Sequence, residues 1–166
     1  MQGDDFVEHR RVSIALTAAG ALAAAGGLLV FFVFAPGMAS NCREAFPDLA
    51  FLFWPGLISV WIIAAVYLAA MVFYFRIVHR IGKDRSFCTE NAREMRFIAC
   101  CMGTAGLLWL LVLLLPHLIW HIRFGPAWLW FIMASLASFA VAILAWGLGF
   151  LLRRAVSFKE ENDLTI

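Results

Sequence analysis

Four long apolar segments, separated by polar ones, dominate the pattern of hydrophobic and polar positions. They cover residues 13–35, 49–75, 97–116 and 127–152, and none contains Asp, Glu, Lys or Arg. A helix needs about 20 apolar residues to cross a hydrocarbon core of about 30 Å, so each segment is long enough to cross once. The pattern therefore predicts an all-α, integral membrane four-helix bundle, made of two transmembrane hairpins, in a single membrane domain over residues 1–166.

Composition supports this interpretation. Hydrophobic residues make up 64% of the chain and charged residues 14%, against roughly 45–50% and about 25% in soluble domains. Most side chains must then face the lipid bilayer or another membrane helix. The first segment holds small residues at Gly20, Ala23, Ala24 and Gly27. Small residues let helix backbones approach closely, so this helix is predicted to pack against a neighbour.

The polar connections are read as loops. Residues 36–48 form the first, residues 76–96 form a long central loop, and residues 153–166 form the tail. Asp48 and Thr89 are predicted to cap the second and third helices, because their side-chain oxygens accept hydrogen bonds from first-turn N–H groups.

Basic residues lie almost entirely on one side of the predicted bundle. Of the 13 Lys and Arg residues, two lie in the outer loops, at Arg43 and Arg123, and all the others lie in the leader, the central loop and the tail. Short loops rich in Lys and Arg stay in the cytoplasm. Both termini and the central loop are therefore predicted to be cytoplasmic.

The central loop and the tail carry the distinctive polar residues. The loop reads IGKDRSFCTENAREMR, with Phe87, Thr89, Glu90 and Asn91, and the tail ends in an acidic run followed by Leu-Thr-Ile. With the four spans, these features resemble the bacterial membrane proteins of domain of unknown function family 2975. The resemblance implies a multi-pass protein of the bacterial plasma (inner) membrane, in a family often encoded beside a small helix-turn-helix regulator, and implies no established activity.

Because the distinctive polar sequence lies on the cytoplasmic side, we expect a non-enzymatic protein that acts through protein–protein interaction or regulation. Its partner would be another protein or further copies of itself. The candidate interaction residues share a position in the central loop or the acidic tail: Arg85, Phe87, Thr89, Glu90, Asn91, Arg93, Glu160, Glu161, Asp163, Leu164, Thr165 and Ile166.

A pore or carrier is the first alternative. Its substrate would be uncharged or lipid-like, because the spans contain none of the charged residues that ion-coupled carriers place inside the membrane. Such a protein should have a polar pocket near the middle of the bilayer, with Ser135, Ser138 and Thr104 as candidate lining residues.

A thiol- or metal-responsive sensor is the second alternative. His117 and His121 are four residues apart and would face the same way on a helix, as paired metal ligands do. Rings with polar tips also anchor helices at membrane interfaces, which explains the same pair without a metal. Cys88 lies among basic residues that favour its thiolate form.

Other chemistry finds no support in the sequence. Phosphate-binding glycine loops, paired catalytic carboxylates and zinc-finger spacings are missing. The basic loop also lacks the interleaved aromatic residues of proteins that bind single-stranded nucleic acid. The sequence therefore predicts no catalytic site, no cofactor and no direct contact with nucleic acid.

Overall fold

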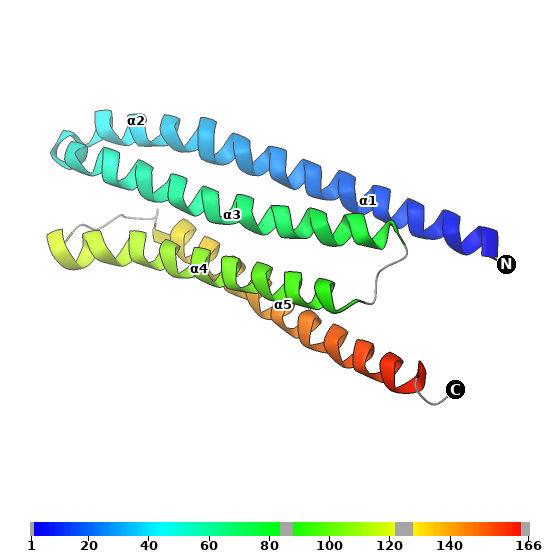
Figure 1. The fold of residues 1–166 in the computed structure, drawn as a ribbon. Helices are drawn as coiled ribbons and strands as arrows, with labels where there is room; N and C mark the ends of the chain where they lie inside the picture. Colours follow the sequence, from blue (N-terminus) through cyan, green and yellow to red (C-terminus); the bar gives the residue numbers. More distant parts are fainter. Residues whose placement is uncertain (1, 84–87, 122–127, 164–166) are drawn as a thin grey trace.

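The computed structural model describes residues 2–83, 88–121 and 128–163, and for residues 2–10, 45 and 159–163 it describes the backbone alone. The elements follow one another as helices (Figure 1): α1 (Gln2–Leu29), a π-helical turn (Val30–Phe34), α2 (Ala35–Ala45), a 3-10 helix (Pro47–Leu52), α3 (Phe53–Ile81), α4 (Thr89–Trp120) and α5 (Trp128–Asp163). The described part of the chain is thus entirely helical apart from short connections.

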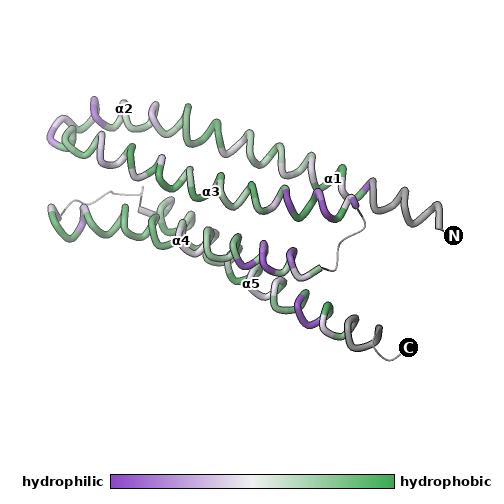
Figure 2. The backbone as a smooth tube through the Cα atoms, in the orientation of Figure 1, coloured by the Kyte–Doolittle hydropathy of each residue, from purple (hydrophilic) through white to green (hydrophobic). Residues whose placement is uncertain are grey.

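Four helical stretches are long and apolar enough to cross a membrane, which confirms the predicted all-α four-helix bundle. They are Arg11–Glu44, Pro47–Ile81, Thr89–Trp120 and Trp128–Phe158. Hydropathy along the backbone shows apolar middles, with hydrophilic residues gathered towards the helix ends (Figure 2). The beginning of α1, the end of α3, the beginning of α4 and the end of α5 all lie at the same end of the bundle (Figure 1), which we call the loop end.

The first predicted loop, residues 36–48, is mostly helical instead. The π turn follows α1 directly, and in it the N–H of Ala35 donates to the carbonyl of Val30. Pro36 then stands in the first turn of α2. A proline ring normally clashes with the carbonyl of the preceding helical turn, and a π turn is wider than an α turn at that point. The helix therefore passes Pro36 and ends at Ala45.

The central loop is also much shorter than predicted. Most of residues 76–96 are helical, because α3 continues to Ile81 and α4 begins at Thr89. Thr89 is the first helical residue and not the cap. The cap position belongs to Cys88, whose backbone is extended and whose carbonyl accepts from the N–H of Asn91 at 3.1 Å. The Thr89 prediction was wrong by one position.

Asp48 does not cap the second long helix. It lies inside the 3-10 helix Pro47–Leu52, which has no side-chain cap, and α3 begins only at Phe53. Pro55 falls in the first turn of α3, where the missing N–H of a proline would have had no partner in the helix.

The tail continues the last helix. Helix α5 has 36 residues and is therefore about 54 Å long at the usual rise, against a hydrocarbon core of about 30 Å. Its last turns must extend beyond the hydrophobic layer. The residues predicted to form a tail after Leu152 are helical as far as Asp163.

The helices pack in chain order, α1 on α3, α3 on α4, and α4 on α5. A small core cluster joins three of them through Ala70, Met102 and Ala142. Glycine permits the close approaches: a Cβ at Gly106 would lie 3.1 Å from the ring of Phe139, and one at Gly149 would lie 3.2 Å from Met95.

The expected packing of the glycine-rich first helix is confirmed at one position. Gly20 is buried, and a Cβ there would overlap the ring of Tyr74 on α3. The Tyr74 hydroxyl donates to the carbonyl of Leu16 at 2.9 Å. By contrast, Gly26 and Gly27 have no atom within 4 Å of an added Cβ. Helix α1 therefore approaches α3 closely between Ser13 and Gly20, and the glycines at positions 26 and 27 make no such close contact.

Candidate functional site

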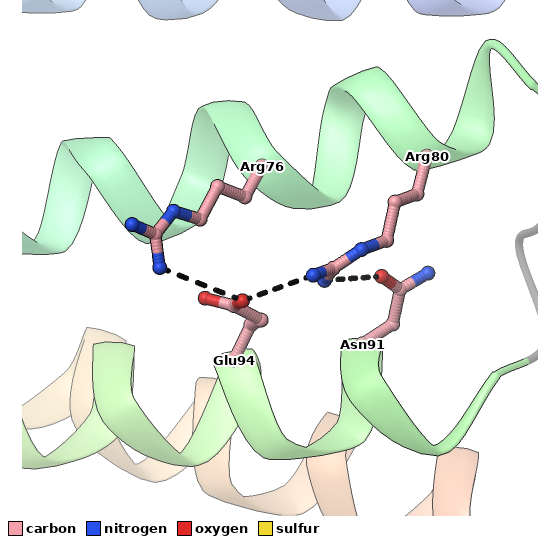
Figure 3. A network of polar contacts seen from close by, with 4 residues as sticks. All are labelled: Arg76, Arg80, Asn91 and Glu94. Atoms are coloured by element: carbon pink, nitrogen blue, oxygen red, sulfur yellow. Dashed lines mark hydrogen bonds and ion pairs between the residues drawn. The ribbon is translucent and has the colours of Figure 1, made fainter.

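A polar network joins α3 to α4 at the loop end (Figure 3). The guanidinium of Arg80 donates to Asn91 Oδ1 at 3.3 Å and to Glu94 Oε1 at 3.2 Å. Arg76 approaches the same carboxylate oxygen, with its Nη1 atom 3.9 Å away. We call these four residues the Glu94 network.

Helical spacing builds the network. Arg76 and Arg80 are four residues apart on α3, and Asn91 and Glu94 are three apart on α4, so each pair occupies one face of its helix. The two faces meet because α3 and α4 lie side by side and run antiparallel (Figure 1). Each residue lies in the predicted central loop, just outside the charge-free spans. Read as a loop, this segment gave no indication that Arg76, Arg80 and Glu94 meet between two helices.

Burial makes the pairing of Glu94 necessary. Only 8% of Glu94 and 1% of Asn91 is exposed, whereas the side chains of Arg80 and Arg76 keep 30% and 57% of their exposure. A carboxylate withdrawn from water is costly unless a cation and hydrogen bonds replace the water. Arg80 supplies both to Glu94, and Arg76 adds a weaker attraction from the surface.

One atom of the network is not satisfied. Glu94 Oε2 is buried and accepts no hydrogen bond from the residues that the structure describes. Buried polar atoms in native proteins nearly always have a partner. The carboxylate is therefore held by one oxygen, while the other retains its capacity to accept a donor.

The structure divides the predicted interaction residues of the central loop. Asn91 was expected to contact a partner from the surface, but it is buried in the Glu94 network. Thr89, Glu90 and Arg93 are exposed on the first turns of α4. Arg93 places its guanidinium 5.5 Å from the centre of the Phe97 ring, a cation–π contact. Arg85 and Phe87 lie outside the described residues.

The acidic tail residues fall on the last turns of α5 or beyond it. Glu160, Glu161 and Asp163 belong to the helix, which the structure describes here by its backbone alone, and Leu164, Thr165 and Ile166 lie outside the described residues. The end of α5 and the beginning of α4 share the loop end of the bundle (Figure 1). The two candidate segments are therefore presented on the same side of the membrane.

The candidate metal pair lies at the opposite end. Helix α4 continues through Pro116 to Trp120, and His121 follows with a left-handed backbone (φ 53°). The helical spacing that would aim both rings in one direction therefore ends before His121. Among the side chains that the structure describes, in residues 11–44, 46–83, 88–121 and 128–158, no three of His, Cys, Asp or Glu are grouped closely enough to hold a metal ion.

The hydroxyl groups expected to line a central pocket are used inside the bundle. Ser135 donates to the carbonyl of Gly106 at 3.0 Å, and Ser138 donates to that of Ala134 at 2.7 Å. Tyr67 links to this interior, with its hydroxyl 2.5 Å from Ser138 Oγ and accepting from Trp109 Nε1 at 3.2 Å. Both serines are buried and Thr104 is exposed, so the three residues do not share a pocket.

Four long apolar helices, with an ion network at one end, define a multi-pass membrane protein. The model of the family described as "Protein of unknown function (DUF2975)" matches residues 37–166, and the chain belongs to this family. It is also 27% identical, over 140 residues, to the uncharacterized membrane protein YoaS of Bacillus subtilis (strain 168), across 84% of this chain and 86% of that protein. No solved structure matches the chain. The expected family is confirmed, and its matched region includes α3, α4 and α5 with the whole Glu94 network.

Proposed function

We propose that this chain is a non-enzymatic membrane protein that binds a protein partner through the loop end of its bundle. The observation that carries the proposal is the Glu94 network. It fixes the first turns of α4 against α3, and thereby presents Thr89, Glu90 and Arg93 on the exposed face of an ordered helix. A surface whose backbone is already ordered loses less entropy when it binds a partner.

The end of α5 supports the same interpretation. Because α5 is longer than the membrane is thick, its acidic last turns extend into water at the loop end, where Arg93 and Arg96 are exposed on α4. Exposed charges of both signs at this end can steer and align a charged partner. The tail would contribute to the same interface as Thr89, Glu90 and Arg93.

The proposal includes the orientation of the protein in the membrane. The excess of Lys and Arg at the loop end supports a cytoplasmic location for that end and for both termini, in the inner membrane of a bacterium. The partner would then be a cytoplasmic protein or the cytoplasmic part of another membrane protein.

The proposal is tested by purification from native membranes in a mild detergent. Two variants alter the loop end: one carries Thr89→Ala, Glu90→Gln and Arg93→Gln, and the other ends at Ser157. Asn91 is left unchanged, because it is buried and its replacement would disturb the fold. The matched control carries His117→Ala and His121→Ala, exposed residues at the opposite end of α4.

We expect a second protein to purify in stoichiometric amount with the parent chain and the histidine control, and to be lost from both loop-end variants. Retention of that protein by both loop-end variants would contradict the proposed interface. Purification of this chain alone, as a monomer or as a homo-oligomer, would contradict the proposal that a second, different protein binds it. Loss of the second protein from the histidine control alone would instead place the interface at the opposite end of α4.

A further inference from the structure

The side of α3 that faces α1 carries a groove, separate from the Glu94 network on the side that faces α4. The groove has a volume of about 570 Å³ and opens to the surface. It is lined by Ser13, Ile14 and Thr17 of α1, by Phe75 and His79 of α3, and by Gly82 and Lys83 just after it. The nitrogen-bearing side chains at the loop end of α3 are thus divided, since Arg76 and Arg80 contact α4 while His79 and Lys83 line the groove.

Close contacts between the two helices define the ends of this groove. At the outer end, Ser13 Oγ donates to the carbonyl of Val78 at 3.3 Å, and a Cβ at Gly82 would lie 2.7 Å from Ser13 Oγ. About two turns deeper, Gly20 packs against Tyr74. The groove between them is therefore a feature of how α1 packs on α3, and not a chance arrangement of surface side chains.

Polarity changes along the groove in a direction set by the helices. Phe75 is the last residue of the charge-free second span, and His79 and Lys83 follow it by one and two turns. Phe75 thus lies on the membrane side of the groove and the two nitrogen donors lie towards the loop end, while Ile14 follows Ser13 on the opposite wall. A phospholipid has the same order of polarity, with acyl chains inside and a phosphate at the interface.

We propose that this groove binds one anionic phospholipid. Its phosphate would lie against Lys83 and His79, and part of an acyl chain would lie along Ile14 and Phe75. The Lys83 ammonium provides charge and His79 a ring N–H donor, and both side chains are exposed, so neither must leave a buried partner to bind the lipid. The ligand is a lipid and not a free phosphate, because Ile14 and Phe75 give the groove an apolar part that a free phosphate would not contact. The inference does not depend on the proposed protein partner.

The alternative to such a site is a diffuse basic collar. Any Lys or Arg near the membrane surface attracts anionic headgroups, each by roughly 1 kcal/mol, which is about five-fold in affinity. A collar responds to the number of charges and not to the shape of a groove. The test must therefore change charge and shape separately.

The experiment measures binding of phosphatidylglycerol to the purified full-length protein by native mass spectrometry, with phosphatidylcholine as the neutral comparison. The charge variant carries His79→Gln and Lys83→Gln. The shape variant, Thr17→Trp, fills the groove and keeps both donors. The control carries Arg96→Gln and Arg153→Gln, which remove two exposed charges at the same end of the bundle but outside the groove.

We expect one tightly bound phosphatidylglycerol on the parent protein, weakened at least five-fold in the charge variant and in the shape variant and unchanged in the control. Equal weakening in the charge variant and the control, with no effect of Thr17→Trp, would show a collar and overturn the site. Soluble glycerol phosphate should compete poorly. If it displaced the lipid at equal concentration, the apolar wall would play no part and the proposal would be wrong. Retained helical circular dichroism verifies the fold of each variant.

Discussion

At the scale of single residues, Glu94 shows how much a position depends on its partners. In the sequence it is one acidic residue among basic ones. In the structure it is buried between two helices, where Arg80 at 3.2 Å replaces the water it has lost. Removing one partner of a fully buried ion pair costs about 3–5 kcal/mol. Arg80 keeps 30% of its side-chain exposure, so the cost here should be smaller, about 2 kcal/mol by the same reasoning.

We therefore predict that Glu94→Leu lowers the free energy of unfolding by about 2 kcal/mol, because Arg80 is left without its anion. In the double variant, Arg80→Met should destabilise the protein less than it does alone, because its partner is already gone; the expected coupling energy is about 1–2 kcal/mol. Reversible unfolding in mixed detergent micelles measures the free energy of unfolding of the parent, the two single variants and the double variant. Additive effects would show that the two groups do not stabilise one another.

Asn91 illustrates the same dependence from the other direction. Its place beside Thr89 and Glu90 suggested a surface role, yet only 1% of it is exposed. Its Oδ1 atom accepts from Arg80, which belongs to the preceding helix. Packing against α3 decides which face of the first turn of α4 is buried. The spacing of residues within the loop does not indicate that face.

At the scale of elements, the contact of α1 with α3 depends on Gly20. The ring of Tyr74 occupies the space that a side chain at position 20 would need, and its hydroxyl is bonded to Leu16 of the same helix. Gly26 has no neighbour within 4 Å of an added Cβ. The two glycines have the same effect on the backbone and differ only in what surrounds them.

We predict opposite outcomes for the same substitution at these two sites. Gly20→Ala should destabilise the protein by about 1–3 kcal/mol, because Tyr74 must move and lose its hydrogen bond. Gly26→Ala should be neutral or stabilising by up to about 1 kcal/mol, through helix propensity alone. Thermal unfolding in detergent provides the comparison. Equal effects at both sites would mean that α1 does not pack on α3 through Gly20.

At the scale of the whole molecule, the distribution of charge predicts the orientation in the membrane. Cys42 is exposed near the end of α2, and Cys88 stands at the beginning of α4 at the loop end. If the loop end is cytoplasmic, a membrane-impermeant maleimide should label a variant that retains only Cys42 in intact cells. A variant that retains only Cys88 should be labelled only after the cells are permeabilised. The reverse pattern would show the opposite orientation.

The sequence by itself determined that the chain crosses a membrane four times as helices. Long apolar segments have few alternatives in lipid, where a backbone can satisfy its hydrogen bonds within a helix. It did not determine where the helices end, because the π turn before Pro36 and the helical ends of α3 and α4 depend on packing between neighbours. Only the tertiary structure brought Arg76 and Arg80 to Asn91 and Glu94, and placed His79 and Lys83 beside α1. Contacts between helices are set by which faces pack together, and hydropathy along one chain does not contain that information.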